Sequence, residues 1–198
     1  MPSPRTDNDT FIHRARRTQL VDTAIAVIAD LGTDRATISR IAAHAGVTRG
    51  VVTYHFRDRT SLFDAVVAHV YELAHRELDT RVHTTNDPRE SLREFIIGSL
   101  DFYADHPAAM AALSAIYRSP DTPRSDRAEH RSEITDLQDI LVAGTKSGQF
   151  RDFDPSVMAD TIRAALDAAL VRIRSGTDIV GEKRELWAIV DGATRITG

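Results

Sequence analysis

Side chains able to bind a nucleic acid gather in residues 37–56, TISRIAAHAGVTRGVVTYHF. The apolar spacing predicts two short helices, at 37–45 and 48–55, separated by Gly46 and Val47. Hydroxyl, guanidinium and imidazole groups can donate hydrogen bonds to base edges and phosphates, and a helix presenting them can enter the major groove. The outer face of the second helix is predicted to display Thr48, Arg49, Thr53, Tyr54 and His55.

Small residues in the same segment would let the two helices cross closely at a tight turn. Ala42 is small enough for the approach, and Gly46 tolerates an unusual backbone conformation at the turn. Thr37 is placed to cap the first helix, because its hydroxyl can accept from an orphan backbone N–H. The apolar contacts between the helices would come from Ile41, Val47 and Val52. An ordinary helical hairpin is the alternative, since the Ala-x-x-x-Gly spacing alone is only moderately specific.

Arginines flank this segment on both sides and give the N-terminal part a positive charge. Residues 1–60 hold nine arginines against six aspartates, whereas residues 61–198 hold 16 basic against 23 acidic residues. This asymmetry is typical of a basic module joined to an acidic body. We therefore predict a DNA-binding domain at 1–60 and a second domain at 61–198. The flanking arginines are Arg14, Arg16 and Arg17 before the segment and Arg57 and Arg59 after it.

Helical periodicity continues through nearly the whole chain, and strand signals are nearly absent. The sequence therefore predicts an all-α fold with an N-terminal helix-turn-helix domain, a C-terminal helical domain and about nine helices. Besides the two short helices, we expect helices at 13–31, 60–82, 88–105, 107–117, 126–147, 155–174 and 181–196.

The chain from about Arg16 to Val67 closely resembles the TetR family of bacterial transcriptional regulators. The resemblance is carried by the signature Tyr54-His55-Phe56, by the basic residues after it and by Leu62-Phe63 in the next helix. It implies that Phe56 packs the helix-turn-helix onto the bundle and that Arg59 contacts phosphate. Thr53 and Thr60 depart from the family's usual tyrosine and glutamate. Motif and resemblance together predict DNA contacts at Arg17, Thr37, Thr48, Arg49, Thr53, Tyr54, His55 and Arg59.

The resemblance also implies partners for the second domain. Family members are homodimers on a palindromic double-stranded DNA operator, joined by two C-terminal helices from each subunit and released when a small-molecule effector binds. The dimer interface is predicted at Ile162, Leu166, Ala169, Leu170, Ile173, Trp187 and Val190. Effector-lining residues are predicted at Phe102, Tyr103, Met110 and Tyr117. For both sets, plain intrachain core is the alternative.

Other kinds of site find little support in the sequence. The chain has no cysteine, and His69, Glu72 and His75 lack the second set of ligands that a di-iron site needs. No Gly-rich phosphate loop or nucleophile elbow is present, so we expect neither an enzyme nor a cofactor or metal. Because no apolar stretch approaches the roughly 20 residues of a membrane span, we expect a cytoplasmic protein without a membrane partner.

Several functional alternatives stay open at this point. The leading prediction is a transcriptional repressor that responds to a small-molecule ligand. Alternatively, the chain could regulate transcription without a ligand, or as an activator. A helical enzyme would need a convergent catalytic set, which is missing. A purely structural DNA binder predicts a small, basic remainder, whereas residues 61–198 are long and acidic.

Overall fold

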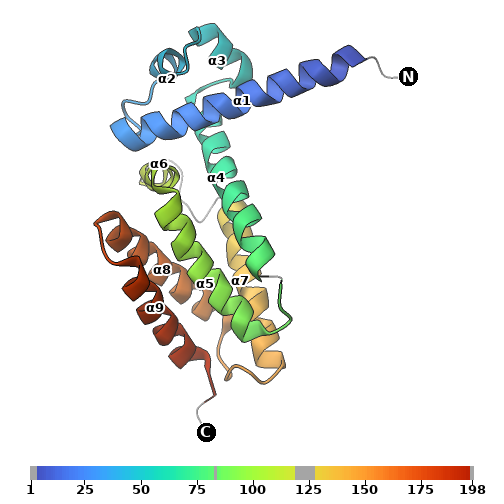
Figure 1. Cartoon of the computed structure of the whole chain (residues 1–198), viewed down its shortest axis with the longest axis vertical. Helices are drawn as coiled ribbons and strands as arrows, with labels where there is room; N and C mark the ends of the chain where they lie inside the picture. Colours follow the sequence, from blue (N-terminus) through green and yellow to red (C-terminus); the bar gives the residue numbers. More distant parts are fainter. Residues whose placement is uncertain (1–3, 83, 119–127, 197–198) are drawn as a thin grey trace. The chain divides into compact units, whose positions relative to one another are not determined.

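A computed structural model describes residues 4–82, 84–118 and 128–196, which fold almost entirely as helices (Figure 1). Over these residues the only β pairing is an isolated bridge between Phe150 and Arg195. The predicted all-α fold is therefore confirmed. The helices are α1 (Pro4–Leu31), α2 (Ile38–His44), α3 (Arg49–His55), α4 (Arg59–Val82), α5 (Pro88–Asp105), α6 (Pro107–Tyr117), α7 (Ala128–Lys146), α8 (Pro155–Arg174) and α9 (Ile179–Thr194).

Most of the described helix ends fall within two residues of the predicted ones, with α1 as the exception. The start predicted at residue 126 lies outside the described residues. Helix α1 begins at Pro4 rather than at residue 13. The polar composition of the first residues hides these first turns of the helix, although proline suits the first helical position. At α9, the Asp178 carboxylate accepts hydrogen bonds from the backbone N–H groups of Val180 and Gly181. This cap starts the helix two residues earlier than predicted.

The chain forms two compact units. The first, unit 1, comprises residues 1–70 and 108–122, and the second, unit 2, comprises residues 71–107 and 123–198. Helix α4 contributes to both units. The predicted boundary at residue 60 concerns the DNA-binding part of the chain, and it stays a prediction.

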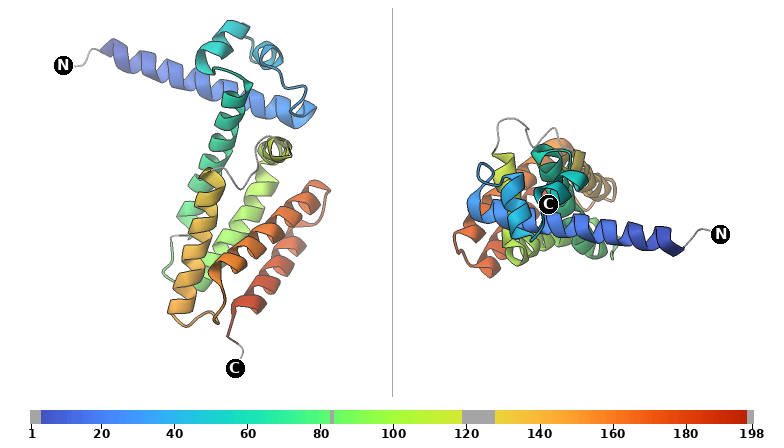
Figure 2. Two further views of the ribbon diagram at one scale, coloured as in Figure 1. Left: turned by 180° about the vertical axis from the view of Figure 1, so that it is seen from behind. Right: turned by 90° about the horizontal axis from the view of Figure 1, so that it is seen from above.

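Unit 1 is built around α1, which packs against α2, while α2 packs against α3. Figure 1 and the left view of Figure 2 show α1 from the side, with α2 and α3 on one flank of it and the N-terminal turns of α1 running on past α3. Apolar side chains spaced at helical intervals on α1 make the core with residues of the two short helices. The buried set is Leu20, Ala24, Ile28, Ile41, Ala42, Val52 and Phe56.

Unit 2 is a helical bundle in which α5 contacts α7, α8 and α9. Helix α8 also packs against α7 and α9, and the four helices run alongside one another in Figure 1. The fully buried side chains of unit 2 are mostly branched aliphatic residues: Leu92, Ile96, Leu100, Leu137, Leu141, Ile162 and Leu166.

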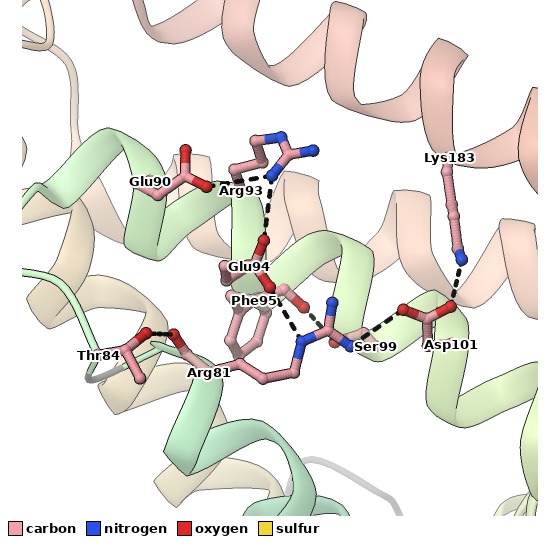
Figure 3. Close-up of polar contacts among 9 residues, drawn as sticks. All are labelled: Arg81, Thr84, Glu90, Arg93, Glu94, Phe95, Ser99, Asp101 and Lys183. Carbon is pink, nitrogen blue, oxygen red and sulfur yellow. Dashed lines mark hydrogen bonds and ion pairs between the residues drawn. The ribbon is translucent and has the colours of Figure 1, made fainter.

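A network of ion pairs joins three helices of unit 2 (Figure 3). Arg81 on α4 donates through Nε to Glu94 at 2.9 Å and through Nη1 to Asp101 at 3.0 Å, both on α5. Lys183 on α9 pairs with the other oxygen of Asp101. Burial alone would raise the pKa of the Asp101 carboxyl, but the hydrogen bonds from Lys183 and Arg81 outweigh it and hold the pKa below its ordinary value. One carboxylate thus links α4, α5 and α9.

The turn between α2 and α3 depends on Gly46, whose φ is +67°. The Gly46 N–H donates to the Ala43 carbonyl at 3.2 Å, and the Val47 N–H donates to the Ala42 carbonyl at 3.0 Å. These two bonds satisfy carbonyls at the end of α2 in the arrangement known as a Schellman motif. The conformation belongs to the left-handed region that glycine adopts most readily.

We predict that Gly46→Ala lowers the free energy of unfolding by about 1–2 kcal/mol, because an L-residue is strained in the left-handed region. A Cβ at Gly46 would have no described atom within 4 Å, so the cost comes from the backbone and not from a clash. Gly46→Asn should cost less, since asparagine tolerates this conformation better. Urea unfolding followed by circular dichroism measures both. A Gly46→Ala variant as stable as the parent would contradict this account of the turn.

Candidate nucleic-acid interface

Helix α3 has one buried side and one exposed side. Val52 is fully buried against the core of unit 1, whereas Tyr54 is 76% exposed. Thr48, Arg49 and Thr53 are also exposed, and His55 is half-buried. The predicted contact residues of this helix therefore share a surface that the fold leaves accessible.

The three threonines of the predicted set differ in what their hydroxyls do. Thr37 caps α2 as predicted, with Oγ1 accepting from the Arg40 N–H at 3.2 Å. Thr53 Oγ1 donates back to the carbonyls of Arg49 and Gly50, each at 3.2 Å. Thr48 precedes α3 but makes no side-chain capping bond to the described residues. Of the three hydroxyls, that of Thr48 is therefore the most available for a hydrogen bond to another molecule.

Aromatic rings lock the end of α3 onto α1. The His13 ring on α1 lies 4.4 Å from the His55 ring and 5.7 Å from the Tyr54 ring, measured between centroids. Phe56 is buried, and the Arg17 guanidinium carbon lies 4.9 Å from its ring centroid. Sequence reasoning did not place His13 among the contact residues, because spacing within one helix does not show which ring of another helix lies beside it.

The His55 imidazole lies in an electropositive, partly desolvated position. Burial lowers its pKa first, and the nearby His13, Arg16 and Arg17 lower it further by disfavouring another positive charge. The Nδ1 atom of His55 is buried without a hydrogen-bond partner among the described residues.

Arg59 has a structural contact in addition to its predicted role. Its Nη1 donates to the Thr33 carbonyl at 3.1 Å, and its guanidinium carbon lies 5.1 Å from the Phe63 ring centroid. It thereby ties the start of α4 to the loop after α1. Next to it, the Asp58 carboxylate accepts from the Ser61 N–H at 2.8 Å, and the Asp58 N–H donates to Ser61 Oγ. This reciprocal cap begins α4 despite Thr60 at the family's usual glutamate position.

The predicted effector-lining residues are divided between the two units. Met110 is buried and Tyr117 is half-buried in unit 1, whereas Phe102 and Tyr103 are buried in unit 2. The Tyr103 hydroxyl accepts a hydrogen bond from the buried Arg163. Burial, opposed by the Arg163 charge, raises the pKa of Tyr103 to about 12.

Sequence reasoning missed the charged group at the centre of this cluster. Arg163 on α8 pairs with Glu133 on α7 and with Asp167, 2.8 Å away on its own helix. Its place in an apolar periodic stretch was the available signal. Its partners on other helices, Glu133 and Tyr103, could not be read from spacing.

The single chain shows how far the residues predicted for a dimer interface are buried in their own subunit, and their role in a dimer stays a prediction. Five of the seven are buried within the single chain, as the intrachain alternative expects: Ile162, Leu166, Ala169, Leu170 and Val190. A side chain buried in one subunit offers little area to another. Ile173 and Trp187 are half-buried. The large apolar residues that α8 and α9 expose are instead Val157, Val171, Val180 and Ile189.

Over the described residues, no group of three or more histidine, aspartate or glutamate side chains is arranged to hold a metal ion. His69 Nε2 lies 3.4 Å from Asp22, and His75 Nδ1 lies 3.9 Å from Asp79. None of the described helices combines the length and apolarity needed to cross a bilayer.

Comparison with known proteins gives one family. The family model described as "Bacterial regulatory proteins, tetR family" matches residues 20–66, which include α2 and α3. The "Probable acrEF/envCD operon repressor" of Escherichia coli K12 is 30% identical over 181 residues, covering 89% of this chain and 71% of that protein.

Two solved structures share the fold. The fatty acid degradation regulator FadR from Bacillus halodurans superposes with a TM-score of 0.79 at 19% identity, covering 89% of this chain and 95% of that one. A transcriptional regulator from Saccharomonospora viridis, solved in complex with choline, gives a TM-score of 0.73 at 18% identity and covers 91% and 98%. The E. coli relative, of which most of the length is covered, and the match to the family model identify the family. The chain belongs to the tetR family of bacterial regulatory proteins, and it is a helix-turn-helix transcriptional regulator that binds DNA.

Proposed function

We propose that this protein represses transcription as a homodimer, binding a palindromic operator through α3 and leaving it when a small-molecule effector binds unit 2. The observation that carries the proposal is the exposed face of α3, held outward by the buried Val52. Its place of action would be the cytoplasm, where the operator lies.

The DNA contacts would divide into two kinds. Arg49 lies in the first turn of α3, where a guanidinium can reach a base edge and donate two hydrogen bonds to guanine. Arg17 and Arg59 lie on α1 and α4, beside the short helices, and would contact phosphates, which orient the protein without reading sequence. The excess of arginine in residues 1–60 supports this assignment.

The exposed faces of α8 and α9 support dimerisation. On α8, Val157, Ala164, Ala168 and Val171 are exposed and recur at intervals of one or two helical turns. On α9 the exposed residues of the same character are Val180, Ala188, Ile189 and Gly192. Small side chains allow two helices to approach closely, and a two-fold axis would turn the adjacent α8 and α9 into a four-helix interface. Such symmetry matches a palindromic operator.

The buried Arg163 cluster supports effector binding in unit 2. A guanidinium inside a helical bundle is costly unless it is paired, and here Glu133, Asp167 and Tyr103 all engage it. Such clusters are common at functional sites. The choline-bound structure shows that this fold can hold a small molecule. Of the four predicted effector contacts, we propose Phe102 and Tyr103, which lie in unit 2. Met110 and Tyr117 lie in unit 1 and stay predictions from the sequence.

We predict that Arg49→Ala weakens the free energy of binding to the operator by about 1–3 kcal/mol, because a base contact is lost. The difference in affinity between operator and random DNA should therefore become smaller. Arg59→Ala should weaken binding to the operator and to random DNA alike. It should also reduce the slope of log affinity against log salt concentration by about one unit. Gel shifts on the DNA upstream of the protein's own gene, at several salt concentrations, measure both effects.

Two controls accompany these variants. Thermal melting of Arg59→Ala separates the loss of a phosphate contact from the loss of the bond to Thr33. His75→Ala changes an exposed residue of unit 2 and should bind like the parent. If Arg49→Ala bound both DNAs as the parent does, α3 would not be the recognition helix.

We predict that Ala168→Arg converts the dimer to a monomer and weakens operator binding at least tenfold, because a large charged side chain enters the proposed interface. Light scattering after size exclusion measures the mass, and circular dichroism checks that the helices remain. Ala143→Arg is the matched control, since Ala143 is exposed on α7 of the same unit. If the Ala168→Arg variant were still a dimer, the exposed faces of α8 and α9 would not be the dimer interface.

A further inference from the structure

Two histidines from different helices meet at the end of α3. Their ring centroids are 4.4 Å apart, and the Tyr54 ring lies 5.7 Å from His13 and 5.2 Å from His55. His13 is exposed, whereas His55 is half-buried and its Nδ1 has no partner among the described residues. The pair therefore opens to solvent through His13, on the side where Tyr54 is also exposed.

The charged surroundings of this pair are positive. The titratable and charged groups that face the His55 ring are His13, Arg16 and Arg17 from α1 and Tyr54 from its own helix. The aspartate that follows it in sequence, Asp58, is engaged by the Ser61 N–H and by the Arg57 guanidinium at 3.0 Å. Among the described side chains, none of the groups that shift the pKa of His55 is acidic. The side chains that the structure describes therefore offer the pair no negative partner.

We propose that His13 and His55 form a single site for a DNA backbone phosphate, and that this site takes up a proton when DNA binds. The inference rests on the proposed DNA interface and adds His13, which the sequence did not single out. It extends the contact surface from α3 onto the N-terminal part of α1, where Arg14, Arg16 and Arg17 are exposed and where α1 runs past α3 (Figure 2).

A phosphodiester supplies what the pair lacks. A protonated imidazole donates from both ring nitrogens, and a phosphate oxygen accepts. In the free protein, burial, the neighbouring His13 imidazole and the guanidinium groups of Arg16 and Arg17 disfavour the charged form of His55, so its pKa is lowered. An adjacent phosphate acts in the opposite direction and favours the cation. The pKa of His55 therefore rises on binding, and the complex holds more protons than the free partners.

The sign of the pH dependence follows from this difference. Because the complex binds more protons, operator affinity falls as pH rises between the lowered pKa of the free protein and the higher pKa of the complex. For a histidine this window lies at about pH 5–8. Uptake of one full proton changes the binding constant about tenfold per pH unit.

The direct test needs only the parent protein. Calorimetric titration of its upstream DNA into the protein, repeated at pH 6.5 in buffers of different ionisation enthalpy, counts the protons taken up. We expect at least about half a proton per subunit. Zero uptake, or proton release, would overturn the inference even if the DNA bound tightly. Failure of the parent to bind this DNA at any pH would count against the proposed function instead.

A double variant locates the proton. His13→Phe keeps a ring against Tyr54, and together with His55→Gln it removes both imidazoles. Between pH 6.0 and 7.5 we expect the parent's operator affinity to change at least about fivefold, and that of the double variant less than twofold. His44→Gln is the matched control, because His44 is exposed on α2 and its Nδ1 lies 2.9 Å from the Arg40 carbonyl. If His44→Gln abolished the pH dependence and the double variant kept it, the site would be misplaced.

Discussion

The buried contact of α3 with the rest of unit 1 is the constraint on which the DNA surface depends. Helix α3 has only seven residues, too few to be stable alone in water. Its orientation comes from Val52, which is fully buried, and from Phe56 at its end. Because side chains four residues apart share a helix face, Val52 and Phe56 both face the core, and Thr53 and Tyr54 point to other sides. Arg49 is exposed in the first turn of the helix. The core thus selects the residues that can touch DNA.

The sequence predicted well those features that depend on local chemistry. Helices α5, α6 and α8 begin at Pro88, Pro107 and Pro155, where the residue type itself favours a helix start. The Thr37 cap and the Gly46 turn also follow from residue type, and both appear as expected. The start of α1 was missed, since its first turns are polar and have no apolar period to read.

Features set by tertiary contacts could not be predicted in this way. Helix α8 carries two apolar stripes, and periodicity does not say which one faces its own chain. The stripe with Ile162 and Leu166 is buried, and the one with Val157 and Val171 is exposed. Arg163 lies in the buried face because Glu133 and Tyr103, 30 and 60 residues away, receive its hydrogen bonds. The contact of His13 could not be predicted for the same reason, because its partner ring, His55, lies on another helix.

Helix α4 connects the chemistry of the two units, since it contributes residues to both. Its first turn holds Arg59, a proposed phosphate contact, and its last turns hold Arg81, which pairs with Glu94 and Asp101. Asp101 in turn binds Lys183 on α9, a helix of the proposed dimer face. An effector can release DNA only by binding one arrangement of the protein better than another. Under the proposed function such a difference would act on these ion pairs, because separating a charge from its partner in a half-buried network costs more than separating a surface pair.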